Sequence, residues 1–588
     1  MKTSITFHPK NTLEMDKVMA LLRTLETPDV APKPDPIEEE FPREDPPDES
    51  DKAIEPAGEV AADRAGWTQK DGWAQWPLAA GARQIFVSTS GYDRNNGLNV
   101  SSPVKTIAAG VALLTDGAGD HLLLKRGDKF LKQDFGEWTK SGKSRESMLL
   151  IGAYGDETRP RPVIQPSPGS QILVGREGTK CSHVAMCDLH FLVSEGHDGS
   201  IRPPHIVWRA EGRCFHVEGC FFAGTVMIAQ RIAGHGPVEE VIFRRNVVDQ
   251  PFAKGGRVHI YWQGVTGGLL EENFLYHLGW SSTVADDKYT HNCYVTHECT
   301  GIVFRRNISM SSSSHGVQLR CGGVMDENVF IDTALQSFGY VLGGSQGSPD
   351  RNGGVSGSIR DNLFIDPKKI DGVDRGTGVQ VGNINSLGLE LRGNMFLNDT
   401  RSGEANSCAI ELDPDNGPAG LCNVTIADNT IYNWRCGLVI QDSNYPATVS
   451  GMRIHGNRWT EMRGSQSMPT FVAILGPQFP LSSFANNEYC KYPEELEVGY
   501  RVGGRTRYAD HDFDWWYRNA EPSATAERVS YPNPDRTIES YSENVDGGGL
   551  LGFIEGCISQ QKTSWRADYT AVSILNYFRE GFGKNLLA

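Results

Sequence analysis

The sequence predicts an all-β protein whose main part, residues 67–490, is a right-handed, single-stranded parallel β-helix. Three observations predict this fold. A pattern apolar-x-x-Asn-x-apolar recurs every 21 to 35 residues, short runs of alternating apolar and polar residues lie between its copies, and glycine is frequent at 65 of 588 residues. Repeats of this length built from short strands are typical of a solenoid. The asparagines that mark the repeat are Asn246, Asn273, Asn307, Asn328, Asn362, Asn394, Asn429, Asn457 and Asn487.

The repeated asparagine has a physical explanation. Asparagine tolerates the left-handed backbone conformation of a tight bend, and stacked asparagines can hydrogen-bond from one coil to the next. The second residue after each asparagine is apolar in eight of the nine copies, Ser309 being the exception. We therefore expect every asparagine to stand at a bend, in the left-handed conformation, with an inward-facing strand directly after it.

Residues 1–26 predict a short amphipathic helix, because Asn11 and Glu14 have the spacing of a capping box before apolar residues at helical intervals. Residues 27–66 predict an extended, disordered linker that is rich in proline and acid. Between Asp35 and Glu59 there are 11 acidic and only two basic residues. Two interpretations of the leading helix stay open: a frayed terminus, or a peptide that attaches the chain to a partner or a particle.

The folded part opens with an ordered series of elements. A strand beginning at Gln84 is followed by an Asn-Gly turn at Asn96, a helix from Ile107 to Leu114 that starts in Pro-Val-Lys-Thr-Ile, and an apolar strand that ends at Gly127. This series resembles the opening segment of pectate-lyase-like β-helix proteins, which include polysaccharide lyases and phage tailspikes. The resemblance covers about 50 residues; it implies the fold but no particular reaction.

After Asn487 the repeat stops. Residues 491–588 are predicted to form an irregular region, with Trp515, Trp516 and Tyr517 as a packing cluster, and then two helices within residues 550–582. We interpret this region as a helical cap that protects an open sheet edge rather than as a separate functional module.

Composition excludes several classes of protein. The net charge is −16, so no basic field favours nucleic acid, and no apolar run is long enough to span a membrane. The 12 cysteines lack zinc-type spacing and mostly fall inside strand-like runs, which predicts buried free thiols. Gly343–Gly347 lacks the lysine and the strand–helix context of a P-loop, so no nucleotide or organic cofactor is expected.

No secretory signal is visible at the N-terminus, so localisation stays unknown; a glycan-directed function would make the protein extracellular or virion-associated.

One strand of each coil carries a polar outward column. Alternation directs Ile260, Cys293, Val317, Val379 and Ile410 inward. Their neighbours then face outward and form a row of aromatic, amide and carboxylate side chains. Such a row suits an elongated saccharide groove. The alternative interpretation is an ordinary solvated strand face, which is also polar. The predicted substrate-binding residues are Tyr261, Gln318, Tyr340, Gln380 and Glu411, with Trp280 from a neighbouring loop.

A long insertion between Asn273 and Asn307 rises beside this column and brings together groups for uronate β-elimination. That reaction needs the carboxylate neutralised, a base for the C5 proton and an acid for the leaving oxygen. Arg320 could neutralise the carboxylate, or Asp286 and Asp287 could hold Ca²⁺ through oxygen ligands. The candidates for the base are His291, His315 and Lys288, and those for the acid are Tyr294 and Tyr289.

Three functions stay open. A polysaccharide lyase acting on an acidic, uronate-containing polysaccharide is favoured. A glycan-binding protein like a phage tailspike or fibre, a homotrimer attached to a particle through its N-terminal segment, is the second. A polygalacturonase-like glycoside hydrolase is the third, because Asp286-Asp287 and His315-Gly316 are similar to elements of that family, but its Asn-Thr-Asp-Gly and Arg-Ile-Lys elements are missing.

Overall fold

The computed structural model describes most of the chain from Gln69 onward. The described residues are 69–194, 205–224, 226–249, 258–277, 280, 285–339, 353–368, 370, 376–399, 408–414, 417, 419–441, 449–463, 470–476, 479–491, 499–504 and 507–588. The helix and linker predicted in residues 1–66, Tyr340 and Gly343–Gly347 lie outside them. In the described part, none of the helices combines the length and apolarity required to cross a bilayer.

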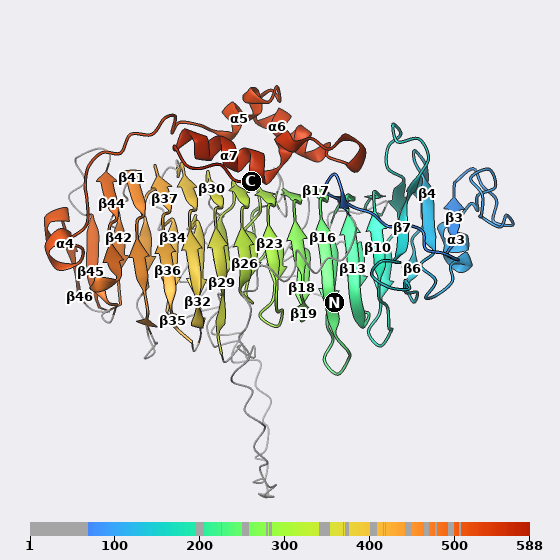
Figure 1. Ribbon diagram of the computed structural model, residues 1–588, viewed down its shortest axis with the longest axis horizontal. Coiled ribbons are helices and arrows are strands. Elements are labelled where there is room, and N and C mark those ends of the chain that lie inside the picture. The colour runs from blue at the N-terminus through green and yellow to red at the C-terminus, as the bar shows by residue number, and fades with distance from the viewer. Residues whose placement is uncertain are drawn as a thin grey trace, which may run out of the picture. The chain divides into compact units, whose positions relative to one another are not determined.

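The predicted parallel β-helix is confirmed. Each coil contributes one strand to each of three parallel sheets, and Figure 1 shows the strands as successive rungs of the solenoid. Sheet 1 contains β3 (Gln84–Val87), β4 (His121–Lys125), β7 (Leu149–Tyr154), β10 (Val184–Cys187), β13 (Gly212–Glu218), β16 (Val238–Arg244), β19 (Val265–Thr266), β20 (Leu269–Glu271), β23 (Val303–Arg305), β26 (Gly323–Asp326), β29 (Val355–Arg360), β32 (Ile384–Arg392), β35 (Leu421–Cys422), β36 (Val424–Ala427), β39 (Val449–Ser450), β40 (Arg453–His455) and β43 (Phe484–Ala485).

Sheets 2 and 3 follow sheet 1 in every coil. Sheet 2 contains β5 (Lys129–Leu131), β8 (Val163–Gln165), β11 (His190–Phe191), β14 (Phe221–Ala223), β17 (Val247–Asp249), β21 (Phe274–Tyr276), β24 (Ile308–Met310), β27 (Val329–Ile331), β30 (Leu363–Ile365), β33 (Met395–Leu397), β37 (Thr430–Tyr432), β41 (Arg458–Met462) and β44 (Glu488–Lys491). Sheet 3 contains β6 (Gly136–Glu137), β9 (Leu173–Gly175), β12 (Ile206–Trp208), β15 (Met227–Gln230), β18 (Val258–Gln263), β22 (His291–Val295), β25 (His315–Leu319), β28 (Leu335–Phe338), β31 (Val379–Gly382), β34 (Ile410–Asp413), β38 (Leu438–Ile440), β42 (Val472–Ile474), β45 (Tyr500–Gly504) and β46 (Arg507–His511), of which β45 and β46 pair antiparallel.

The nine asparagines form a continuous ladder at the bend between sheets 1 and 2. In Asn362, for example, Nδ2 donates to Oδ1 of Asn394 at 2.9 Å and to the Met325 carbonyl at 2.7 Å, while Oδ1 accepts from the backbone N–H and from Nδ2 of Asn328 at 2.8 and 2.9 Å. The same bonds recur from Asn246 to Asn487. The predicted coil-to-coil bonding is therefore confirmed.

The predicted left-handed conformation of these asparagines is wrong by one position. The residue before each asparagine has a positive φ, for example 54° at Glu272 and 53° at Asp361, whereas the ladder asparagines do not. The preceding residue therefore makes the turn, which leaves the asparagine side chain directed inward to stack. Glycine occupies the left-handed position only twice in the ladder, at Gly393 and Gly456.

The interior is filled by the apolar positions of the strands. Ile260, Cys293, Val317, Val379 and Ile410 are fully buried, as predicted. Four phenylalanines stack on successive coils: Phe330 lies 5.1 Å from Phe364, which lies 4.6 Å from Phe396, and Phe304 precedes them at 6.3 Å from Phe330. All 12 cysteines are free and all but Cys422 are buried, which confirms the predicted thiols.

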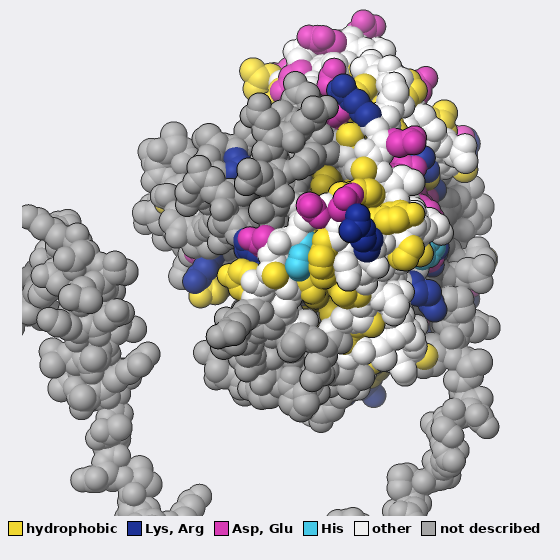
Figure 2. All heavy atoms as spheres, turned by 90° about the vertical axis from the view of Figure 1, so that its left-hand side faces the viewer, with side chains coloured by type: hydrophobic (Ala, Val, Ile, Leu, Met, Phe, Trp, Pro, Cys, Tyr) yellow, Lys and Arg dark blue, Asp and Glu magenta, His cyan; other side chains and the backbone are white. Residues whose placement is uncertain are grey.

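Both ends of the solenoid carry added structure. At the N-terminal end, α3 (Ile107–Leu113) begins at Thr106, whose hydroxyl accepts from the Ala109 N–H. At the other end lie η1 (Leu481–Ser483) and α4 (Phe513–Asn519), and Trp516 of α4 stacks on Tyr500 with ring centroids 4.5 Å apart. Figure 2, which views this end, shows acidic, basic and apolar side chains mixed among the described atoms.

Glu521 terminates the asparagine ladder. Its Oε1 accepts from the backbone N–H and from Nδ2 of Asn487 at 2.8 and 3.0 Å, as the next asparagine of the ladder would. Its Oε2 accepts from the Tyr489 hydroxyl at 2.7 Å and from Trp516 Nε1 at 3.2 Å. A fully buried carboxylate thus satisfies the donors that the last coil would leave open.

The C-terminal helices lie along sheet 2, as Figure 1 shows, whereas the end of the solenoid is covered by α4 and the residues around Glu521. The outward residues of sheet 2 are apolar, for example Ile308, Val329 and Leu363, and they pack against Phe553, Ile574 and Phe578. A strand that is apolar on both faces needs such a cover. The segment contains α5 (Ile538–Asn544), α6 (Gly549–Ile558), η2 (Lys562–Ser564), η3 (Ala567–Tyr569) and α7 (Ala571–Gly581).

The ladder predicts a large cost for removing one rung. Asn362→Ala deprives the Asn328 donors and the Met325 carbonyl of their partners in a fully buried place. We expect the free energy of unfolding, measured by urea denaturation, to fall by about 3–5 kcal/mol. Asn519→Ala, at an exposed asparagine of α4, is the control and should change it by less than about 0.5 kcal/mol. Equal effects of the two substitutions would refute the role of the ladder.

Asp366 predicts a pH-dependent stability. Burial, aided by Glu539 of α5 and by Asp332 of the previous coil, raises the pKa of Asp366 to about 7. Between its unfolded pKa and 7 the folded state therefore holds a proton that the unfolded state releases, so this carboxyl costs stability as the pH rises and the full cost applies above 7. Asp366→Asn should stabilise the protein at pH 8 by on the order of 2 kcal/mol and have little effect at pH 4.

Thermal unfolding across this pH range provides the measurement. Asp546→Asn is the matched control, because Asp546 is also left-handed, with φ of 57° against 51° at Asp366, but is exposed. A gain for Asp366→Asn that is the same at pH 4 and pH 8 would contradict the explanation.

Candidate functional site

The register of sheet 3 aligns the predicted substrate-binding column, with one change. Successive partners along the sheet are Tyr261, Tyr294, Gln318, Ser337, Gln380 and Glu411. Ser337 thus holds the position that the sequence analysis assigned to Tyr340, which lies outside the described residues. Gln318 and Gln380 are only 4% and 7% exposed, whereas Tyr261, Tyr294 and Glu411 are half-buried, so the column is accessible mainly at its two ends.

The two tyrosines of the column form one aromatic group. Their rings meet edge to face, with centroids 5.5 Å apart, and the Tyr261 hydroxyl donates to Gln263 Oε1 at 3.1 Å. Burial raises the pKa of Tyr261 to about 12. At the other end, Glu411 Oε1 accepts from Gln441 Nε2 at 2.9 Å.

His291 and His315 touch at the start of adjacent strands. Their Nδ1 atoms are 3.0 Å apart, and His291 Nδ1 also lies 3.4 Å from the backbone N–H of His315. That N–H can only donate, so if His291 Nδ1 accepts from it, the proton between the rings belongs to His315 Nδ1, which also lies 3.1 Å from the Ser314 hydroxyl oxygen. The basic nitrogen of a neutral His315 is then Nε2, while a neutral His291 carries its proton on Nε2.

Tyr294 connects this pair to Arg320. The ring of His291 meets Tyr294 edge to face with centroids 5.7 Å apart, and the Arg320 guanidinium lies 5.2 Å from the Tyr294 ring centroid. Burial raises the pKa of the Tyr294 hydroxyl, although nearby Arg320 opposes the change, so this tyrosine is protonated at neutral pH. Arg320 Nε is buried and has no hydrogen-bond partner among the described residues.

The loop carries a second cluster. Asp286 forms an ion pair with Lys368 at 3.0 Å, and the Lys368 ammonium lies 4.2 Å from the Trp280 ring centroid. Trp280 Nε1 donates to the Ser311 carbonyl at 2.8 Å. Trp280 is therefore held within the loop cluster.

The remaining loop candidates, Asp287, Lys288 and Tyr289, contact one another. Asp287 Oδ1 accepts from the Tyr289 N–H at 2.7 Å, and the Asp287 N–H donates to Ser313 Oγ at 2.5 Å. Lys288 and Tyr289 are exposed, and the Lys288 ammonium lies 5.1 Å from the Tyr289 ring. These contacts bring Lys288 and Tyr289 together at the surface, whereas His291 and His315 are buried.

The two aspartates do not fit a calcium site as they stand. Calcium takes six to eight oxygen ligands, but the Asp286 carboxylate is already bound to a lysine and Asp287 supports the turn. Within the described part of the chain, no three His, Cys, Asp or Glu residues gather as metal ligands would. The calcium role stays a prediction, and the chemistry below requires no metal.

Sequence reasoning missed Lys368. It lies three coils after the loop that it holds, in a turn between sheets 2 and 3, and no spacing links it to Asp286. The run of four serines, Ser311–Ser314, could have indicated this part of the site in the sequence. All four are buried. Ser313 Oγ donates to the Asp287 carbonyl of the loop, and Ser311 Oγ donates to Asp332.

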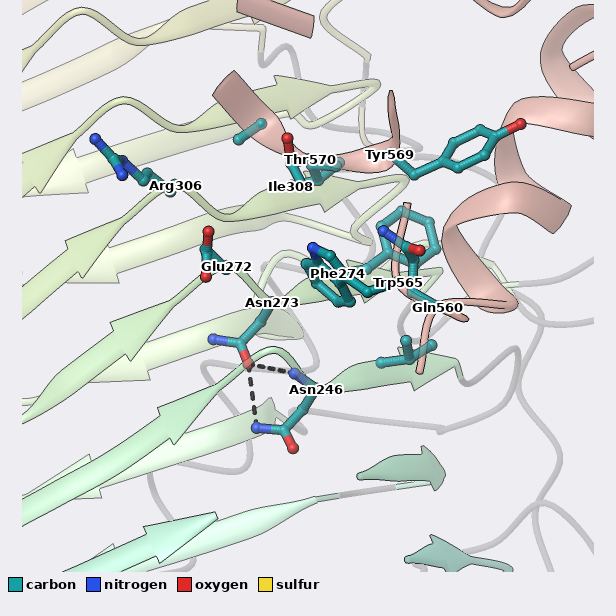
Figure 3. Close-up of a pocket in the computed structure, with 12 residues that line it drawn as sticks. Asn246, Glu272, Asn273, Phe274, Arg306, Ile308, Gln560, Trp565, Tyr569 and Thr570 are labelled. Atoms are coloured by element: carbon teal, nitrogen blue, oxygen red, sulfur yellow. Dashed lines mark hydrogen bonds between the residues drawn. The ribbon is translucent and has the colours of Figure 1, made fainter. Parts of the chain in front are cut away.

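A crevice between sheet 2 and the segment before α7 is not a ligand site. It is lined by Asn246, Asn273, Phe274, Trp565 and Tyr569 and has a volume of about 10 Å³, room for one water at most. Figure 3 shows that the asparagines in it bond to each other as part of the ladder.

No model of a known protein family and no curated protein matches the chain. Among solved structures, a mannuronic acid-specific polysaccharide family 6 lyase from human gut microbiota is 14% identical over 84% of this chain and 99% of its own, with a TM-score of 0.38. A rhamnogalacturonan lyase is 10% identical over 79% and 92%, with a TM-score of 0.34, and a GH136 lacto-N-biosidase from Eubacterium ramulus is 13% identical over 76% and 68%, with a TM-score of 0.24. These scores are low, so the assignment to the parallel β-helix class rests on the strand pairing of this chain.

Proposed function

We propose that the protein is a carbohydrate-active enzyme, a lyase that cleaves a uronate-containing polysaccharide by β-elimination at sheet 3. The observation that carries the proposal is Arg320. It is a guanidinium whose buried Nε lacks a partner among the described residues, next to a protonated tyrosine that contacts a histidine pair. An unsatisfied buried donor is costly, and Arg320 as a whole is partly exposed, so its guanidinium offers further N–H donors to an arriving carboxylate.

Arg320 would neutralise the uronate carboxylate. A charge-assisted hydrogen bond from a guanidinium to the carboxylate spreads the negative charge that develops when the neighbouring C5 proton is removed. The position beside Tyr294 suits this role, since the Tyr294 ring contacts both the Arg320 guanidinium and the ring of His291.

His315 and Tyr294 would move the protons. Nε2 of neutral His315 takes the C5 proton, the electron pair of that C–H bond forms the C4–C5 double bond, and the C4–O4 bond breaks. The Tyr294 hydroxyl gives its proton to the departing oxygen, which its raised pKa permits because the hydroxyl is protonated at neutral pH. His291 holds the proton-bearing side of His315 and orients its ring.

The two alternative functions, hydrolysis and glycan binding without cleavage, are less well supported, and the tests below distinguish them from the lyase. Hydrolysis requires two carboxyl groups roughly 5 to 9.5 Å apart across the bond that breaks, and of the predicted aspartates Asp286 is engaged by Lys368. Binding alone would use the same tyrosine column without turnover.

Activity assays on pectate, alginate and glycosaminoglycans test the proposal through the ultraviolet absorbance of unsaturated uronate ends. We expect Arg320→Ala to lower kcat/KM by about 100- to 1000-fold, and His315→Ala and Tyr294→Phe by about 100-fold or more each. Tyr508→Phe, at an exposed tyrosine of β46, should leave the rate unchanged. A lack of unsaturated ends from every uronate polymer, or full activity of all three variants, would overturn the lyase proposal.

Chelation separates the two ways of neutralising the carboxylate. If Arg320 does so, activity in EDTA should equal that in added Ca²⁺, because no step needs the metal. If EDTA abolishes activity and Ca²⁺ restores it, while Asp286→Asn and Asp287→Asn remove the response, the aspartates bind calcium and the metal-free account fails.

A further inference from the structure

A large groove lies at the N-terminal end of the solenoid, on sheet 1. In Figure 1, β3, β4 and β7 lie at the opposite end from α4. The groove has a volume of about 1350 Å³, above the roughly 300–1,000 Å³ usual for a small-molecule site. It is separate from Tyr294 and Arg320, which belong to sheet 3 in the central coils. We call it the N-terminal groove.

The floor of the N-terminal groove is apolar because of a change along sheet 1. The outward partners Phe86, Leu123, Gly152 and Cys187 carry no charge. From Glu218 to Arg360 the same outward row alternates in sign: Arg244 binds Glu218 at 2.6 Å and Glu271 at 3.2 Å, and Arg305 binds Glu271 at 2.6 Å. The groove therefore lies over the uncharged rungs at the N-terminal end of this row.

The walls come from the two ends of the described chain. One is the hairpin of β1 (Gln69–Lys70) and β2 (Trp73–Ala74), and the other is the segment Lys562–Trp565 before α7. Trp73 and Trp565 meet edge to face at 5.3 Å, and the Arg245 guanidinium lies 4.7 and 5.0 Å from their rings. The hairpin is also bonded to sheet 1, since the Ala74 N–H donates to Glu218 and Arg244 donates to the Gly72 carbonyl. The walls are therefore held in place.

Gly152 indicates that the floor is kept open for a ligand. It lies inside β7, where glycine weakens a strand, and its φ is not positive. A Cβ added there would meet its nearest neighbours, Leu150 and Cys187, at 3.5 Å or more, so packing does not exclude a side chain. Glycine in a strand with neither a conformational nor a packing reason marks a close approach by another group.

The chemistry of the rim fits an acidic sugar chain. Trp76, Tyr154 and Trp565 are partly exposed aromatic groups of the kind that stack on sugar rings. Lys70, Lys125 and Lys562 also line the groove and form no ion pair within the described residues. Three carboxylates line it as well, but Asp188 is neutralised by its ion pair with Arg126, which leaves Asp71 and Glu157. Cations therefore prevail here, although the whole chain carries −16.

We propose that the N-terminal groove binds a stretch of the acidic polysaccharide remote from the reacting site, and so anchors a long substrate. The proposal rests on the proposed function for the class of polymer. It also gives the two walls a function, because ordering the β1–β2 hairpin and the segment Lys562–Trp565 costs conformational entropy. Short oligosaccharides, which cannot reach both places, would not use the groove.

Affinity electrophoresis of the full chain through gels containing pectate, alginate, hyaluronate or chondroitin sulfate tests the anchor. Gly152→Val fills the floor with a residue that favours strands, so we expect weaker retardation with an unchanged or higher Tm. Lys125→Glu combined with Lys562→Glu should weaken binding about tenfold or more and raise KM for polymer, while kcat on short oligosaccharides stays that of wild type. Lys129→Glu, an exposed lysine of β5 on sheet 2, is the control.

The outcomes separate this proposal from the proposed function. If the polymer is cleaved but the groove variants bind it as wild type does, the groove proposal is wrong and the lyase stands. If retardation depends on the groove residues but no polymer is cleaved, the anchor stands and the lyase falls. If none of the four polymers retards the wild-type chain, the groove proposal is wrong. Should Gly152→Val fail to fold, the lysine pair decides.

Discussion

The asparagine ladder is the interaction on which the rest of the structure depends. A parallel β-helix must repeat the same bend in coil after coil although its loops differ in length, and backbone hydrogen bonds alone do not specify which residue occupies the bend. Here each asparagine bonds to the next one and to a carbonyl of the preceding coil, so a slip by one residue would break three or four buried hydrogen bonds at once. The coils can differ by 14 residues in length and still stack, because the extra residues leave the ladder untouched.

That same register determines what can be a site. Since the strand after each asparagine and the strand of sheet 3 keep their alignment, side chains far apart in sequence become neighbours at the spacing of adjacent strands, about 4.8 Å. Tyr294 and Arg320 are brought together in this way, as are His291 and His315. The charge row of sheet 1 and the apolar row of sheet 2 follow from the same alignment, and each has its own consequence: the first binds the N-terminal hairpin, the second binds the C-terminal helices.

Most of this framework could be predicted, and each exception has its own physical cause. The ladder, the inward residues of sheet 3 and the buried thiols follow from local period and residue type. Ser337 takes the place in the column that was assigned to Tyr340, because the pairing of β25 with β28 shifts its register between His315 and Gln318, which the sequence pattern does not show. The left-handed residue was misplaced because it varies in type, from Arg245 to Asn486, so no composition marks it. Lys368 and the flank covered by α7 depend on contacts between distant coils, which a pattern confined to one coil cannot contain.

Two local departures from this regular structure, one at Arg320 and one at Gly152, point to ligand binding. In a chain whose bend is satisfied donor by donor, ending with Glu521, the buried Nε of Arg320 and the open strand glycine Gly152 are departures that cost stability. A solenoid can tolerate them because its stability is a sum over coils and the contacts between neighbouring coils, so a local loss of stability in one coil is offset by the others. Departures of this kind are expected where a protein meets a ligand. These two lie at separate places, Arg320 beside sheet 3 in the central coils and Gly152 in sheet 1 at the N-terminal end. A chain polymer, unlike a small ligand, can occupy two such places at once, and that is the physical reason for treating both as parts of one polysaccharide-binding surface.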